Sequence, residues 1–141
     1  MGVAVDILNW AKSQIETLGL VSSVKRRKRI VRAKGDPDPV CVIAMEQPEG
    51  FIRRSTGGYV TLSFTLDVAL YYAKSPEYAD PDWLLNARAS LRSMLLVVQP
   101  FEGICHAAFD PAPVLSPIAF VEGFDISPMR FVYHGAELIG V

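Results

Sequence analysis

The sequence has few of the residues on which catalytic and metal sites depend. Its 141 residues include two cysteines and two histidines, and the two pairs are scattered. Four such candidates do not supply the ligand spacing of a zinc site. His106 follows Cys105 directly, but neighbouring residues of a strand point to opposite faces, which disfavours a nucleophile–base pair. We therefore expect no catalytic residue, no metal and no cofactor, and a protein that is not an enzyme.

Long apolar runs are also missing. Charged residues or prolines break every hydrophobic stretch before it reaches the ~20 residues of a transmembrane helix. The first residues, Met1 to Asp6, lack the basic start and apolar centre of a signal peptide. Cys41 and Cys105 lie among apolar neighbours, a setting typical of buried free thiols. We expect no membrane contact and synthesis in a cytoplasm.

What remains is the composition of an ordinary globular chain. Half of the residues are hydrophobic and the formal net charge is −1, which excludes intrinsic disorder. Neither internal repeats nor low-complexity segments interrupt it. The length suits one domain spanning residues 1–141.

The charge is distributed unevenly. Seven of the 14 basic residues lie between positions 25 and 34, and the rest of the chain holds seven basic and 15 acidic residues, a formal charge of −8. One interpretation is a solvated edge strand, since cations on an edge discourage unwanted pairing. The other interpretation is a surface that contacts either the phosphates of DNA or acidic residues of a neighbouring subunit. The candidate residues are Lys25, Arg26, Arg27, Lys28, Arg29, Arg32 and Lys34.

The acidic residues that follow occur in pairs beside prolines. Asp36 and Asp38 belong to a turn, where we expect them to face the preceding cations, and Asp80 and Asp82 begin a helix. Turn and cap chemistry explains both pairs better than acid–base catalysis does.

Two helices and a sheet are predicted by periodicity. Apolar residues at spacings of three and four predict a helix within residues 3–20 that ends at Gly19. They predict a second helix with Asp80 as its N-cap and Pro81 as its first residue, which continues to residue 98 and ends at Pro100. The continuous apolar run 40–45 predicts a strand buried on both faces. Residues 51–54 then pair back through a glycine-bearing hairpin loop.

The strand after this loop is the clearest element. Seven alternations between Tyr59 and Tyr72 predict a strand of about 45 Å at ~3.4 Å per residue, with Phe64 on the buried face. Such a strand either projects past the body of the domain or bends at Asp67. Four aromatics near its end are candidate interface residues: Tyr71, Tyr72, Tyr78 and Trp83.

The final third contains several prolines. Residues 101–117 are expected to be loop or short edge strand, 118–121 and 129–133 two closing strands, 123–128 their connection, and 134–137 a turn. The predicted fold class is α+β: a mostly antiparallel sheet with two helices packed on it, in a single domain.

This order of elements resembles the tail terminator (tail completion) proteins of long-tailed bacteriophages. The matching features are the helix ending near Leu18-Gly19-Leu20, a basic early strand, the long strand 59–72, the helix starting at Asp80-Pro81-Asp82 and the closing strands around 124–131. The proline-rich stretch 109–117 departs from this layout.

The resemblance implies a structural virion subunit of the tail or neck. It implies a homo-oligomeric, six-membered ring that caps the tail tube, stops its growth, contacts head-completion proteins and lets DNA pass through its channel. Two alternatives stay open: a head–tail adaptor or stopper of the neck, and a stand-alone nucleic-acid-binding protein that uses the 25–34 tract.

Overall fold

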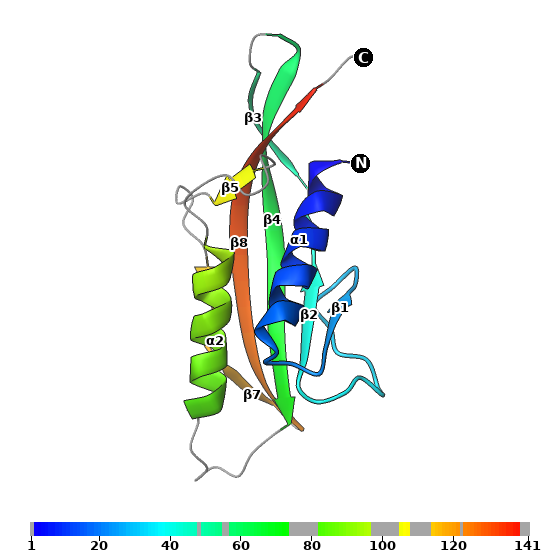
Figure 1. Ribbon diagram of the computed structural model, residues 1–141, viewed down its shortest axis with the longest axis vertical. Coiled ribbons are helices and arrows are strands. Elements are labelled where there is room, and N and C mark those ends of the chain that lie inside the picture. The colour runs from blue at the N-terminus through cyan, green and yellow to red at the C-terminus, as the bar shows by residue number, and fades with distance from the viewer. Residues whose placement is uncertain are drawn as a thin grey trace.

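Two 15-residue strands, paired along their whole length, form the centre of the structure. In this computed structural model, strand β4 (Tyr59–Ala73) runs antiparallel to β8 (Phe124–Leu138), from the pair Tyr59–Leu138 to the pair Ala73–Phe124 (Figure 1). The structure describes residues 2–47, 49–54, 57–73, 82–96, 105–107, 114–121 and 123–138. The predicted long strand is thus confirmed, one residue longer than expected.

The other strands flank this pair in one sheet. The main order of strands is β1 (Ser23–Arg26), β2 (Val40–Ala44), β4, β8 and β5 (Cys105–Ala107). Strand β3 (Gly50–Arg54) also pairs with β4. Strands β6 (Val114–Leu115) and β7 (Ala119–Val121) both pair with β8. Among the described strands, the β1–β2 pair alone is parallel. The expected mostly antiparallel sheet is confirmed, as is the burial of β2 on both faces.

Both helices cover the same face of the sheet. Helix α1 (Val3–Leu18) and helix α2 (Asp82–Leu95) bury apolar stripes against the alternate residues of β4. The predicted face of β4 is confirmed, since Phe64, Leu66 and Val68 are at most 1% exposed and belong to this core. Each such side chain contributes ~1.5–3 kcal/mol by leaving water. The structure therefore confirms the predicted α+β class.

Long-range contacts complete the helix ends. Gly19 ends α1 in the left-handed region (φ 68°), as expected for a glycine after a helix. At its start no local side chain caps α1; instead Glu137 of β8 accepts a 2.9 Å hydrogen bond from the Val3 amide. Tyr133 Oη donates to the Leu95 carbonyl at the end of α2 over 2.7 Å. Helix α2 ends at Leu95, earlier than the expected residue 98, since Leu96 is no longer helical. The expected cap at Asp80-Pro81 and residues 97–100 lie outside the described residues.

Two expectations about strands are wrong. The basic tract is not a strand throughout, because β1 ends at Arg26 and the chain then forms a loop up to β2. Residues 123–128 and 134–137 are not loop and turn, since all but Gly123 belong to β8. The apolar alternation of β4 supplies a partner surface that overrides the weak local propensity of these residues. Pro128 fits because β7 pairs with residues 124–126 and β6 with 129–130, which leaves proline in the gap between them.

Candidate functional site

The loop between β1 and β2 is built around the carboxylate of Asp36. Arg27 donates two hydrogen bonds to it, of 2.5 and 2.7 Å, and the Ala33 amide donates a third of 3.0 Å. These bonds, that of Arg27 foremost, hold the pKa of Asp36 well below its usual range. The side chain of Asp36 is 7% exposed and that of Arg27 27%. Arg27 therefore stabilises the loop internally through its ion pair with Asp36.

Three further contacts fix the loop to the sheet. Arg32 donates a 2.8 Å bond to the Asp36 carbonyl, and its guanidinium carbon lies 4.1 Å from the centre of the Phe124 ring. Tyr71 Oη donates to the Ile30 carbonyl over 2.5 Å, and burial raises the pKa of this phenol. Asp38 accepts a 2.7 Å bond from the Ala73 amide at the end of β4. Arg32, like Arg27, thus serves the loop itself.

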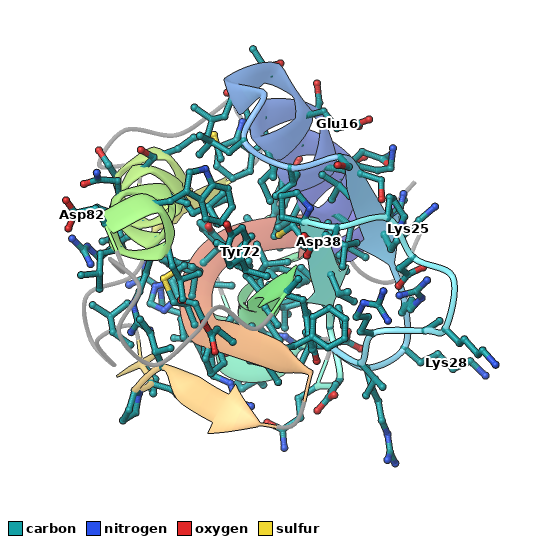
Figure 2. The ribbon with its side chains drawn as sticks, turned by 90° about the horizontal axis from the view of Figure 1, so that it is seen from below. Glu16, Lys25, Lys28, Asp38, Tyr72 and Asp82 are labelled. Carbon is teal, nitrogen blue, oxygen red and sulfur yellow. The ribbon has the colours of Figure 1, made fainter. Side chains whose placement is uncertain are left out.

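The other five cations of the tract face outward. We call them the cationic surface: Lys25, Arg26, Lys28, Arg29 and Lys34. None of them forms an ion pair within the described part of the chain, although Arg26 donates to Asn9 Oδ1. Figure 2 shows Lys25 and Lys28 pointing away from the body. Residues 25–39 include no aromatic side chain, so the surface suits phosphates and not base stacking.

The structure therefore divides a tract that the sequence presents as one group. All seven cations were candidates for a contact surface, but two of them, Arg27 and Arg32, stabilise the loop itself. The expectation that the acids of 35–39 face the cations holds for Asp36 but not for Asp38, whose carboxylate accepts from a backbone amide instead. The sequence signal for the Arg27–Asp36 ion pair was a short basic tract followed by an acid beside a proline.

The four candidate interface aromatics do not form one cluster. Tyr71 and Tyr72 point to opposite faces of β4, Tyr71 toward the loop and Phe124, Tyr72 toward α2. Tyr72 stacks on Trp83, with ring centroids 4.5 Å apart, and Trp83 stays 36% exposed. Tyr78 lies outside the described residues. Among the three described aromatics, Trp83 alone combines a defined packing contact with a surface that is still exposed.

A second feature is the projection of the long strand beyond the body of the domain, one of the two alternatives expected from its length; the apolar side chains exposed there were not predicted. The hairpin of β3 and the first part of β4 projects beyond the helices at one end of the molecule, together with the end of β8 (Figure 1). We call Gly50–Arg54 and residues 57–62 the arm. Every residue of β3 is exposed; Phe51 is 69% exposed, Ile52 40% and Tyr59 45%. The only hint in the sequence was that the strand is too long for a small domain.

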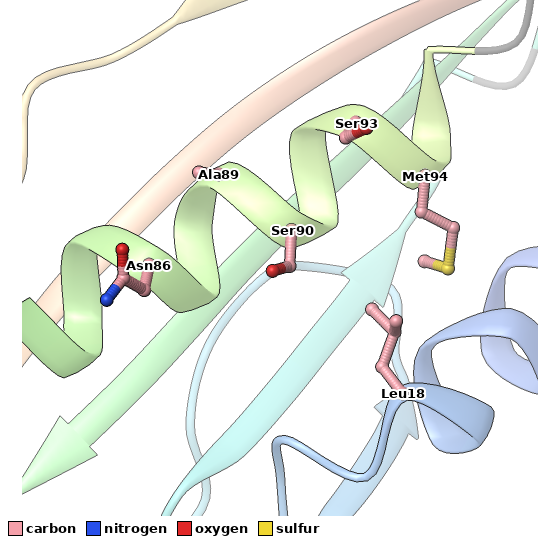
Figure 3. A pocket seen from close by; sticks show the side chains of 6 residues that line it. All are labelled: Leu18, Asn86, Ala89, Ser90, Ser93 and Met94. Atoms are coloured by element: carbon pink, nitrogen blue, oxygen red, sulfur yellow. The ribbon is translucent and has the colours of Figure 1, made fainter.

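A shallow groove separates the two helices on the covered side of the sheet. It has a volume of about 590 Å³ and lies between the end of α1 and the outer side of α2 (Figure 3). Its lining residues are Leu18, Asn86, Ala89, Ser90, Ser93 and Met94. Leu18 is 38% exposed, and Leu85 on the same outer side of α2 is 48% exposed.

Two further buried groups, Asp67 and Cys41, lie in the sheet away from the loop. Asp67 is nearly buried and pairs with Arg130 across the β4–β8 ladder at 2.8 Å, which raises the pKa of Arg130. Burial raises the pKa of the Cys41 thiol to about 12. Within the described ranges, no three His, Cys, Asp or Glu side chains are grouped as metal ligands. The side chains of Cys105 and His106 lie outside what the structure describes.

Neither described helix is long and apolar enough to cross a membrane. A scan against models of known protein families and a search of curated proteins both found no match to the chain.

Proposed function

We propose that this chain is a structural subunit of the tail or neck of a long-tailed bacteriophage, a tail terminator that forms a homo-oligomeric ring on the tail tube. The observation that carries the proposal is the arm. Three large apolar side chains at 40–69% exposure, on a hairpin that leaves the core, are typical of a surface that contacts another protein. The family resemblance supplies the six-membered ring, the tube and the head-completion proteins as partners, and the virion as the location.

The cationic surface supports the same function from a different part of the molecule. Two of the outward cations lie on β1 and three on the loop that is fixed by Asp36 and Tyr71, so they present positive charge without further ordering of the backbone. In a ring this charge faces either the DNA in the channel or acidic residues of a neighbour. Phosphate attraction of this kind is independent of base sequence and falls steeply with salt.

Native mass spectrometry and electron microscopy of the purified protein test the proposal. We expect a closed ring without DNA, at about 93 kDa for six subunits of 15.5 kDa each. Mixing with tail-tube protein should give a capped tube of defined length. A chain that stays monomeric alone and leaves tube growth unchanged contradicts the proposal, and one that binds only head-completion proteins favours the adaptor or stopper alternative.

The cationic surface itself favours a second candidate, a stand-alone protein that binds nucleic acid. The double variant Lys28→Ser/Arg29→Ser tests it, because neither side chain takes part in the hydrogen bonds described above that hold the loop. Lys28→Arg/Arg29→Lys is the matched control, since it keeps the charge at the same two positions. If the surface binds duplex DNA, the slope of log K against log salt should become less negative by about two in the first variant and stay unchanged in the control. DNA binding by a monomer favours this candidate; an absence of DNA binding removes it.

A further inference from the structure

The two histidines of the chain lie directly opposite each other on neighbouring strands. Strand β5 pairs with β8 in the register Cys105–Gly135, His106–His134 and Ala107–Tyr133. The sequence contains no other histidine. Residues directly opposite in an antiparallel pair share one face of the sheet and have Cβ atoms ~4.5–5.5 Å apart. The fold therefore brings together two titratable residues that are far apart in the sequence.

This histidine pair belongs to the face of the sheet that is turned away from the helices. Tyr133 pairs with Phe64, and both are buried in the core beneath α1 and α2. Because side chains alternate along a strand, His134 and its β4 neighbour Ser63 belong to the opposite face. His134 is partly buried there. A positive charge on its imidazole is therefore hydrated less fully than in the unfolded chain.

The described strands place few other charges on this face. The positions next to His134 on β8 and β4 are uncharged: Val132, Ala136, Ser63, Thr61 and Thr65. Beyond them, Arg53 of β3 pairs with Thr61, and it is a cation. Along β4 in the other direction, the nearest described carboxylate on this face is that of Asp67, which already pairs with Arg130 at 2.8 Å. The charges of these strands thus do not offset a second positive charge on the histidine pair.

Strand β5 has little else to hold it on the sheet. It is three residues long, lies at the end of the strand order, and among the described strands it pairs with β8 alone (Figure 1). Like charges directly opposite each other destabilise a strand pair. Histidine gains its positive charge between about pH 7 and about pH 5. A small repulsion at the middle pair of this short ladder therefore shifts the docking of β5 measurably.

We propose that the His106–His134 pair makes the docking of β5 on β8 sensitive to pH. Near pH 8 both imidazoles are neutral, whereas near pH 5 both bind a proton and repel each other. The undocked state binds the second proton more readily than the docked state, so docking weakens as the pH falls. Undocking uncovers the edge of β8 at residues 133–135 and its backbone hydrogen-bonding groups. The inference concerns one subunit and does not depend on the proposed ring.

A double-mutant cycle at two pH values tests the inference, because it separates the repulsion between the two imidazoles from every other contact that either of them makes. The variants are His106→Gln, His134→Gln and the double variant, since glutamine stays neutral and keeps hydrogen-bonding groups. Amide hydrogen exchange of residues 105–107 and 133–135 reports the docking of β5, and urea unfolding reports the stability of the whole chain. Near pH 8 we expect no unfavourable coupling. Near pH 5 the coupling should lower the protection of these amides by about two- to fivefold.

Ser63 provides the matched control, because it lies opposite His134 on the β4 side and carries no charge. A cycle of Ser63→Ala with His134→Gln should give the same coupling at both pH values. All samples contain EDTA, so that no metal ion bridges the imidazoles, and asparagine replaces glutamine where a glutamine variant does not fold. A His106–His134 coupling that is equal at both pH values, or that becomes favourable near pH 5, overturns the inference. A pH-dependent change of the same size in the Ser63 cycle overturns it as well.

Discussion

Replacing Asp36 by Asn tests whether a single carboxylate holds the cationic loop. The substitution keeps the shape but removes the charge, and the amide group turns donors toward the guanidinium of Arg27. Two bonds from Arg27 and one from the Ala33 amide are affected. Hydrogen bonds to charged groups contribute ~1.5–3 kcal/mol, and the partial exposure of Arg27 places the expected loss of unfolding free energy near the lower end, about 2 kcal/mol.

The pH dependence of this loss has a definite sign. The pKa of Asp36 is lowered in the folded state, so its contribution is fully present above the unfolded value of about 4 and is lost as the pH falls below it. Chemical denaturation at pH 7 should show the full difference between wild type and Asp36→Asn, and at pH 3 a smaller one. Asp38→Asn, which retains an acceptor oxygen for the Ala73 amide, is the control and should change stability little. A loss below 0.5 kcal/mol at pH 7, or an equal loss at both pH values, would refute this account of the loop.

Three further substitutions probe the core and the loop. Phe64→Ala removes a side chain that is 1% exposed and opposite Tyr133, and should lower the unfolding free energy by ~3–5 kcal/mol in urea titrations; a loss under about 1 kcal/mol would mean that the other face of β4 is buried. Cys41→Ser leaves an unpartnered hydroxyl in an apolar site and should cost about 1–3 kcal/mol, whereas Cys41→Ala keeps the site apolar; equal stability of the two variants would contradict this. Tyr71→Phe removes the bond to the Ile30 carbonyl and should cost about 1 kcal/mol, with faster amide exchange confined to the loop; unchanged exchange would show that the bond does not order it.

The parts of the fold that sequence reasoning predicted well are those with strong periodicity. The alternation from Tyr59 to Tyr72 identified both the length and the buried face of β4, and Gly19 identified the end of α1. These signals are local, because side-chain alternation and a left-handed glycine act within a few residues. Elements of this kind need no knowledge of their partners.

Strand β8 shows where local reasoning fails. Pro128 and the sequence His134-Gly135 read as breaks, yet the chain stays extended because β4 pairs with it over all 15 residues. The sequence could not predict, for a similar reason, which cations of the basic tract stabilise the loop and which face outward. Nothing in the spacing of Arg27 and Arg32 distinguishes them from Lys28 or Arg29; only the positions of Asp36 and Phe124 in space do so.

The size of the arm predicts how the ring should assemble. Covering the exposed parts of Phe51, Ile52 and Tyr59 would contribute about 4 kcal/mol in total, since full burial of each side chain contributes ~1.5–3 kcal/mol. Association of two proteins costs an estimated ~4–15 kcal/mol in lost freedom of motion, so a single contact made through the arm gives a weak dimer. The last contact of a ring forms within an assembly that is already joined and avoids this cost. Analytical ultracentrifugation over a dilution series should therefore show monomers and closed rings with few intermediates, and stable dimers and trimers at intermediate concentrations would contradict it.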